Sequence, residues 1–158
     1  MADIYQILDS LSLPYTRYDH PAVFTCAEAE LHCAHVPGGI CKNLFLRNRK
    51  DDKHFLVVVS NEKKADLKKL EAILGEKVSF ASPERMLEYL GVTPGSVTLL
   101  GLIYDARKEL LVVIDEDLWK HEQLQMHPLV NTATVVLKRE DVKAFLDWRG
   151  NALRFVQL

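Results

Sequence analysis

Apolar residues along this chain are spaced as in helices in some segments and as in strands in others. Apolar residues recur at helical spacing between residues 3 and 12, which predicts a helix, and residues 15–20 alternate like a strand until His20-Pro21 ends it. Thr25 and Glu28 have the spacing of a capping box at the start of a further helix. The same reasoning predicts helices over 26–35, 64–75, 83–91 and 139–150, and strands over 41–48, 54–60, 77–81, 109–115 and 152–158.

The stretch HPLVNTATVVL, residues 127–137, combines a polar beginning with an apolar, β-branched end. Alternating valine and threonine are typical of a strand, so the whole stretch is predicted as one strand. His127, Asn131 and Thr132 then stand at or near the beginning of that strand. An imidazole and an amide where a buried strand begins are candidates for a functional role.

Helices and strands follow one another without an internal repeat, a low-complexity segment or a linker. The length of 158 residues suits one domain. We therefore expect residues 1–158 to form a single α/β domain, with a mixed, mostly antiparallel sheet flanked by helices.

Composition and charge are those of an ordinary soluble protein, with 48% hydrophobic residues, 27% charged residues and a formal net charge of −2. Bulk charge does not predict a nucleic-acid partner, so any such site must be a local patch. The N-terminus lacks the features of a signal peptide, and no apolar run is long enough to span a bilayer. The odd number of cysteines predicts reduced thiols and a cytoplasmic location.

Metal binding and thiol catalysis are two candidate chemistries. Five histidines and cysteines lie close together in the sequence, namely Cys26, His32, Cys33, His35 and Cys41. They contain no C-x-x-C pair of the kind usual at zinc sites, so no metal is expected. Adjacent strand residues point to opposite faces, so if Lys42 faces a cleft, Cys41 faces away and is structural.

Lys42 interrupts the start of an otherwise apolar strand, where lysine is seldom buried without a partner. Taken alone, Lys42 is explained by an ammonium group that reaches solvent from a strand end. His127 alone is explained by a structural histidine, and Gly95 by a turn. No Walker loop, dinucleotide fingerprint or nucleophile elbow is present.

Four motifs change this interpretation, because they occur in one order and at characteristic separations: HPAVFT, CKNLFLRN, GVTPGSVTLLGL and HPLVNTATVVL. Together they resemble the YbaK-like, prolyl-tRNA-synthetase-associated editing family, and more narrowly its free-standing members that deacylate alanine mischarged on proline tRNA. The resemblance covers essentially the whole chain and implies that family's editing-domain fold. It implies hydrolysis of an aminoacyl ester at a tRNA 3′ end without a cofactor. Mischarged tRNA is then the expected partner, and prolyl-tRNA synthetase is a second candidate partner.

The resemblance also implies which residues form the site. The family lysine falls on Lys42, the family histidine on His127 and the glycine-loop backbone on Gly95. Since an aminoacyl ester is already activated, water can attack it while backbone N–H groups stabilise the oxyanion. Lys42 is expected to be an electrostatic clamp, and His127 to position the ribose and the ester. The expected substrate-binding residues are Thr25, Leu31, Asn43, Ser96, Met126 and Asn131.

Substrate specificity is expected to depend on size, with Leu31 and Met126 as walls of a pocket that holds alanine and excludes proline. One position departs from the family's G-x-x-x-P loop, because Leu99 stands where proline is expected and φ is no longer fixed there. Phosphate contacts are expected from the cations of the hairpin tip, Arg47, Arg49, Lys50 and Lys53.

Two alternatives stay open at this point. The enzyme could remove another amino acid, such as cysteine, from proline tRNA. The chain could also be a non-catalytic module of the same fold that binds tRNA or protein, and Leu99 is the residue that favours this alternative.

Overall fold

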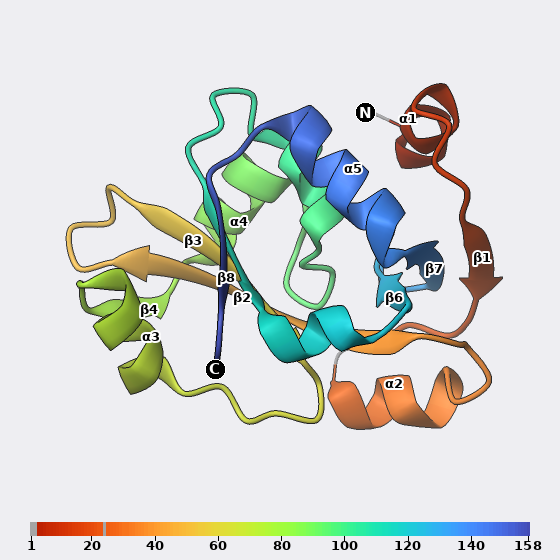
Figure 1. The fold of residues 1–158 in the computed structure, drawn as a ribbon, viewed down its shortest axis with the longest axis horizontal. Coiled ribbons are helices and arrows are strands. Elements are labelled where there is room, and N and C mark those ends of the chain that lie inside the picture. Colours follow the sequence, from red (N-terminus) through yellow and green to blue (C-terminus); the bar gives the residue numbers. More distant parts are fainter. Residues whose placement is uncertain (1–2, 24) are drawn as a thin grey trace.

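The computed structural model describes residues 3–23 and 25–158, except for the side chains at positions 26, 29 and 30. A sheet runs through the middle of the molecule, and helices cover both of its faces (Figure 1). The helices are α1 (Ile4–Ser10), α2 (Cys26–His32), α3 (Leu67–Leu74), α4 (Pro83–Leu90) and α5 (Arg139–Arg149), with the short 3-10 helices η1 (Leu99–Tyr104) and η2 (Glu116–Lys120). The strands are β1 (Thr16–Asp19), β2 (Gly39–Asn48), β3 (His54–Ser60), β4 (Val78–Phe80), β5 (Leu111–Asp115), β6 (Gln123–Met126), β7 (Ala133–Lys138) and β8 (Leu153–Val156).

The strand order in the sheet is β1-β7-β6-β2-β3-β5-β8, and β4 pairs with β2 outside this path. Four pairings between described strands are antiparallel, namely β1–β7, β2–β3, β2–β4 and β6–β7. Three are parallel, namely β2–β6, β3–β5 and β5–β8. The prediction of a mixed, mostly antiparallel sheet flanked by helices is therefore confirmed.

Apolar side chains cover both faces of the sheet. On one face, Phe45 and Val58 belong to a large buried cluster with residues of α1, α4, η1 and α5. On the other face, Leu44 and Val57 pack in a second cluster with α3. All seven residues of the central strand β3 are buried as a result. None of the described helices is long and apolar enough to cross a membrane.

Strand β2 loses its neighbour halfway along one edge. Gly39 and Ile40 pair with β6, and residues 46–48 pair with β4, while β3 occupies the opposite edge throughout. Residues 41–44 therefore have no described strand beside them on the edge that β6 and β4 share. This opening in the sheet separates β2 from the end of β6.

The prediction of one strand over residues 127–137 was wrong in its first half. Residues 127–132 form the loop between β6 and β7, and the strand begins only at Ala133. Leu129 has a positive φ of 69°, which a strand does not accommodate. The loop is tied instead to the segment after β1, where His20 N–H donates to Thr132 O and Val23 N–H to Asn131 O. Strand β6, which is only four residues long, was not predicted from the sequence.

Candidate functional site

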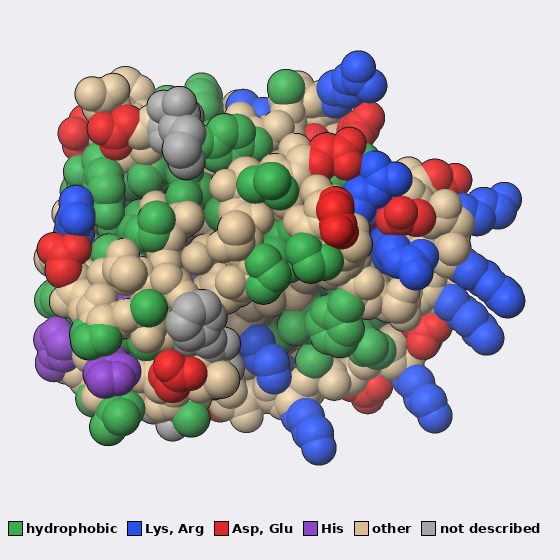
Figure 2. Space-filling model, turned by 180° about the vertical axis from the view of Figure 1, so that it is seen from behind, with side chains coloured by type: hydrophobic (Ala, Val, Ile, Leu, Met, Phe, Trp, Pro, Cys, Tyr) green, Lys and Arg blue, Asp and Glu red, His purple; other side chains and the backbone are tan. Residues whose placement is uncertain are grey.

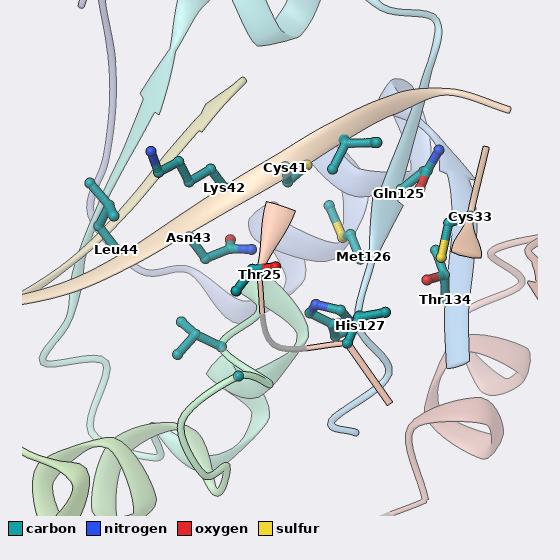
Figure 3. A pocket seen from close by; sticks show the side chains of 14 residues that line it. Thr25, Cys33, Cys41, Lys42, Asn43, Leu44, Gln125, Met126, His127 and Thr134 are labelled. Atoms are coloured by element: carbon teal, nitrogen blue, oxygen red, sulfur yellow. The ribbon is translucent and has the colours of Figure 1, made fainter. Parts of the chain in front are cut away.

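A pocket of about 330 Å³ lies in the opening between β2 and β6. It is within the usual range for small-molecule sites, at the lower end. Residues from the segment before α2, from the segment after it, from β2, from the loop before η1 and from the β6–β7 hairpin meet here (Figure 3). The lining residues are Val23, Thr25, Cys33, Ile40, Cys41, Lys42, Asn43, Leu44, Gly95, Val97, Gln125, Met126, His127 and Thr134.

The position of the pocket follows from the sheet register. Ile40 pairs with Gln125 in the parallel β2–β6 ladder, so their side chains share a face. Two residues further along each strand, Lys42 and His127 lie on that same face by alternation. Because β2 and β6 no longer pair beyond Gln125, the space between them is open, and residues of the opposite face, including Asn43, also reach it.

Lys42 and Asn43 bring unpaired polar groups into this opening. Both are half-buried, and neither side chain forms a hydrogen bond or ion pair with any other residue that the structure describes. Figure 3 shows the Lys42 ammonium on one side of the pocket, opposite Gln125 and Thr134. A partly buried cation without a protein anion can bind a negative charge supplied by a ligand.

His127 lines the pocket on the side of Thr25 and Met126 (Figure 3). Burial lowers the pKa of His127 below its usual value, although a backbone hydrogen bond with Ala133 partly opposes this shift. Its Nδ1 is buried and has no hydrogen-bond partner among the described residues. Burial therefore favours the neutral form of His127, and one of its ring nitrogens is buried beside the pocket without a described partner.

The glycine loop supplies one backbone donor. Ser96 N–H donates to Thr93 O at 3.1 Å, which closes a turn over Pro94 and Gly95. Gly95 has a φ of 94°, the conformation that the third residue of such a turn requires and that glycine accepts. The N–H of Gly95 forms no hydrogen bond with the described residues, and Gly95 lines the pocket. This N–H can therefore donate to an oxyanion.

Three of the predicted substrate-binding residues do not line the pocket. Ser96 is buried, and its N–H is committed to the turn, so it cannot serve as the second oxyanion donor in this geometry. Leu31 is 76% exposed on α2 and is not among the residues that line this pocket. Asn131 donates its side-chain N–H to Val23 O at 3.0 Å and so supports a lining residue from behind. Thr25, Asn43 and Met126 do line the pocket.

Several lining residues were missing from the sequence analysis, above all Gln125 and Thr134. Gln125 belongs to the overlooked strand β6. Thr134 is the last residue of the H-P-L-x-N-T-A-T motif, so the motif itself was a signal for it. Strand alternation places Thr134 on the same face as His127, because Met126 pairs with Val135.

The cysteines do not form a reactive centre. Burial raises the pKa of Cys41 to about 12, so this residue is a thiol at neutral pH. The expectation that Cys41 faces away from Lys42 was too simple, since both line the pocket where the strand edge is open. Among the described residues, no three histidine, cysteine or acidic side chains gather as metal ligands, and the Cys26 side chain lies outside the description.

Comparisons with known proteins identify the family of this chain. Residues 20–145 match the model of the aminoacyl-tRNA editing domain family. The prolyl-tRNA editing protein ProX of Acetoanaerobium sticklandii is 39% identical over 96% of this chain and 93% of its own length. The prolyl-tRNA synthetase associated domain-containing protein 1 of Mus musculus is 34% identical over 95% of this chain and 91% of its own.

A solved structure shares the fold. It is described as a candidate trans-editing enzyme for prolyl-tRNA synthetase, and it superimposes with a TM-score of 0.72 at 22% identity, over 100% of this chain and 98% of its own. The family match spans most of the chain and includes the pocket residues from Val23 to Thr134. The chain therefore belongs to the aminoacyl-tRNA editing domain family and is an aminoacyl-tRNA deacylase.

Proposed function

We propose that this protein removes alanine from mischarged proline tRNA, as an editing enzyme that acts on the released aminoacyl-tRNA. The observation that carries the proposal is the convergence of Lys42, His127 and the free N–H of Gly95 in one pocket large enough for an aminoacyl-adenosine end. None of these polar groups is neutralised by a described ion pair. A merely structural arrangement would satisfy its buried polar groups internally.

The proposed reaction needs no protein nucleophile. A water molecule attacks the ester carbonyl, and the negative charge that develops on the carbonyl oxygen is stabilised by Gly95 N–H. The bond between the acyl carbon and the ribose oxygen then breaks, the amino acid is released as its acid, and the proton lost by the water goes to the ribose oxygen, which leaves as the tRNA hydroxyl. The Lys42 ammonium acts as a clamp on that charge or on the phosphate of the terminal adenosine. Neutral His127 positions the ribose and the ester through a hydrogen bond. The absence of an anion beside Lys42 among the described residues leaves its full charge for this role.

Size selection is proposed to act at the apolar part of the pocket. Met126 is 4% exposed and is packed in the core, so the wall it forms next to His127 cannot move easily. Val97 lines the pocket from the glycine loop. A rigid wall rejects proline by exclusion, while a difference of one methylene gives only about 1–3 kcal/mol of selectivity.

The body of the tRNA is proposed to contact the tip of the β2–β3 hairpin. Arg49 and Lys50 form no ion pair within the described part of the chain. They line a groove together with Lys53 and Lys77, and these cations outnumber the carboxylates of the groove, Asp52 and Glu76. Figure 2 shows lysine and arginine side chains projecting from the end of the molecule that carries the hairpin and α3. Replacing Arg49 and Lys50 by alanine should raise KM and weaken its salt dependence, with kcat unchanged.

The test is to incubate the protein with alanyl-, cysteinyl- and prolyl-tRNA for proline and to follow ester loss. Rapid loss of alanine, with the prolyl ester intact, supports the proposal. Faster loss of cysteine would identify cysteinyl-tRNA, and not alanyl-tRNA, as the substrate. Hydrolysis of none of the three would show that the protein is a non-catalytic binding module. Cys41→Ser is the matched control variant, because its activity should equal that of the wild type if no thiol takes part.

A further inference from the structure

The far side of the pocket, opposite Lys42, is formed by Gln125 and Thr134 (Figure 3). Both side chains are buried, with 7% and 5% exposure, and both line the pocket. A buried amide and a buried hydroxyl each have donor and acceptor capacity, so their role depends on where their hydrogens are directed. The surrounding hydrogen bonds determine these directions for both residues.

Gln125 donates both of its amide hydrogens to the backbone. Its Nε2 lies 2.9 Å from Val36 O and 3.2 Å from Gly38 O, and carbonyl oxygens can only accept. The orientation of the amide is therefore fixed, with Oε1 on the other side. Figure 3 shows this oxygen on the side of the amide that faces Thr134. It forms no hydrogen bond with the described residues.

Thr134 is oriented by a histidine. His20 Nδ1 lies 2.8 Å from Pro21 O, so Nδ1 must carry a hydrogen to donate. In the neutral ring Nε2 is then an acceptor, and the Thr134 hydroxyl, 2.8 Å away, donates its hydrogen to it. Thr134 Oγ1 can offer only lone pairs to its remaining neighbours, which are the Cys33 thiol and the pocket.

We propose that Gln125 Oε1 and Thr134 Oγ1 form the acceptor site for the α-amino group of the aminoacyl ester, with His20 as a positioning residue. An α-ammonium group has N–H donors and no acceptor, which is the complement of two oxygens whose hydrogens are all committed. Repulsion from the Lys42 ammonium directs this group to the same end of the pocket. The ester carbonyl then lies between the two ends, beside His127.

This inference rests on the proposed ester hydrolysis and adds a requirement to it, namely a free α-amino group. The probe is lactyl-tRNA for proline, which carries a hydroxyl in place of the amino group of alanine and has nearly the same size. Hydrogen bonds to a charged donor contribute about 1.5–3 kcal/mol, so the wild type should prefer the alanyl ester by about 10- to 150-fold in kcat/KM.

Three variants test the individual contacts. Thr134→Val keeps the shape of the side chain and removes the acceptor, so it should reduce the alanyl-to-lactyl ratio toward one. Thr134→Ser keeps the hydroxyl and should restore the ratio. His20→Asn should also reduce the ratio, because the Thr134 hydrogen is then free to turn into the pocket. A purely structural role of these residues would slow both substrates alike and leave the ratio unchanged.

The outcomes separate this inference from the proposed function. Equal hydrolysis of both esters by the wild type, or an unchanged ratio in folded Thr134→Val, overturns the acceptor site while leaving the deacylase intact. Failure of the wild type to hydrolyse alanyl-tRNA overturns the proposed function. In that case the binding of 3′-alanylamido- and 3′-lactylamido-adenosine, compared by titration calorimetry, measures the same ratio without chemistry, and equal affinities overturn the inference.

Discussion

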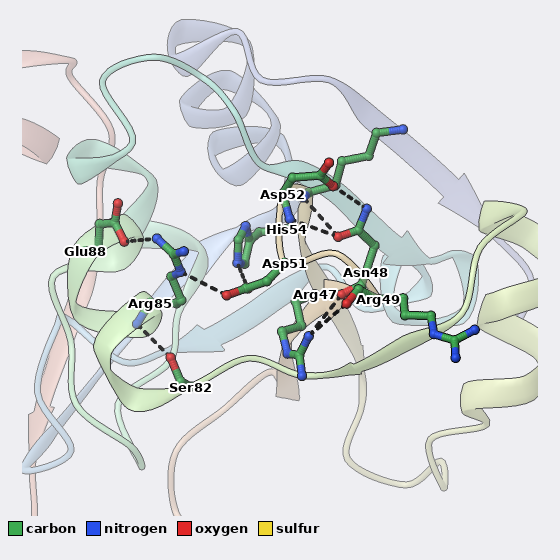
Figure 4. Close-up of polar contacts among 10 residues, drawn as sticks. Arg47, Asn48, Arg49, Asp51, Asp52, His54, Ser82, Arg85 and Glu88 are labelled. Carbon is green, nitrogen blue, oxygen red and sulfur yellow. Dashed lines mark hydrogen bonds and ion pairs between the residues drawn. The ribbon is translucent and has the colours of Figure 1, made fainter.

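Strand β2 has polar side chains at its hairpin end and, near its middle, beside the pocket, and the two groups differ in whether they have hydrogen-bond partners. At the hairpin end, Asn48 donates to Asp52 at 2.6 Å, and its Oδ1 accepts from the N–H groups of Asp52 and Lys53 (Figure 4). Asn48 also donates to Glu76 at 3.1 Å. Beside the pocket, the side chains of Lys42 and Asn43 form no hydrogen bond with any described residue. Polar side chains of the same strand are thus fully hydrogen-bonded at the hairpin and without a described partner at the pocket.

The histidines show the same contrast. The His54 side chain is 2% exposed, and its Nε2 bonds Asp51 at 2.9 Å, while Asp51 also accepts from Arg85 at 3.3 Å. Burial would raise the pKa of Asp51, but hydrogen bonds from His54 and Arg85 outweigh it and leave the pKa below its usual value. His127 is buried too, but its Nδ1 has no described partner. Partnered groups stabilise the fold, and unpartnered groups in a pocket are available to substrate.

Two lysines provide the strongest test of this contrast. Lys63 Nζ bonds Asp115 at 2.8 Å, Asp117 at 2.6 Å and the carbonyl oxygen of Leu158 at 2.7 Å, whereas Lys42 binds nothing described. Lys42→Ala should lower kcat for alanyl-tRNA by about 30- to 1000-fold, the loss of roughly 2–4 kcal/mol of transition-state stabilisation, without a change in Tm.

Lys63→Ala is the matched variant, and it should lower the stability of the protein without lowering its activity. Asp115 is fully buried and would keep an unpaired charge, so we expect a loss of about 2–3 kcal/mol of stability, less than for a fully buried pair because Lys63 is 25% exposed. Activity per folded molecule should stay at the wild-type value. Near-normal hydrolysis by Lys42→Ala, or loss of activity in folded Lys63→Ala, would show that the absence of a hydrogen-bond partner does not distinguish functional from structural lysines.

The histidine pair gives a smaller effect. His127→Ala should lower the hydrolysis rate about tenfold, since it removes one hydrogen bond to the substrate. His54→Ala should leave the rate unchanged and destabilise the protein by about 2 kcal/mol, because the ring stacks on Phe45 and Tyr89 and bonds Asp51. Steady-state kinetics and urea unfolding of both variants check the two expectations, and exchanged phenotypes would contradict them.

Leu99→Pro tests the glycine loop, where the resemblance to the editing family predicts proline in place of Leu99. Leu99 is the first residue of η1, and Thr98 before it has an extended backbone, with a φ of −157° and a ψ of 150°. Proline fits both conditions. Leu99 is also 1% exposed, so the smaller ring should cost about 1–2 kcal/mol of stability. Hydrolysis should change by less than about threefold. A complete loss of activity in the folded variant would show that the loop cannot accept the family residue.

The smallest expected effect is a pH dependence of stability. Burial lowers the pKa of His127 in the folded state, so below about pH 6.5 the unfolded chain takes up a proton that folded His127 resists. The stability associated with neutral His127 is therefore present above that pH and is lost as the pH falls toward the folded pKa. The difference in Tm between pH 7.5 and 5.5 should be smaller for His127→Gln than for the wild type, and an equal difference would contradict it.

The sequence by itself determined most of the helices and strands and indicated the motif residues. Helices begin at caps that the sequence contains, such as Ser82, which accepts from Arg85 N–H, and Thr25, which accepts from Glu28 N–H. Lys42, His127 and Gly95 could be proposed as site residues from their motifs, and all three line the pocket. Periodicity and capping depend on residues a few positions apart, so they can be read along the chain.

Only the tertiary structure decided which polar groups are free. Lys63 bonds Asp115, which is 52 positions away in the sequence, and His20 bonds Thr134, which is 114 positions away. The opening beside Lys42 exists because β6 and β4 share one edge of β2 without meeting. Ser96 became unavailable through its turn, and Leu31 faces solvent. Hydrogen-bond partners and pocket walls depend on contacts between distant segments, which no local pattern in the sequence encodes.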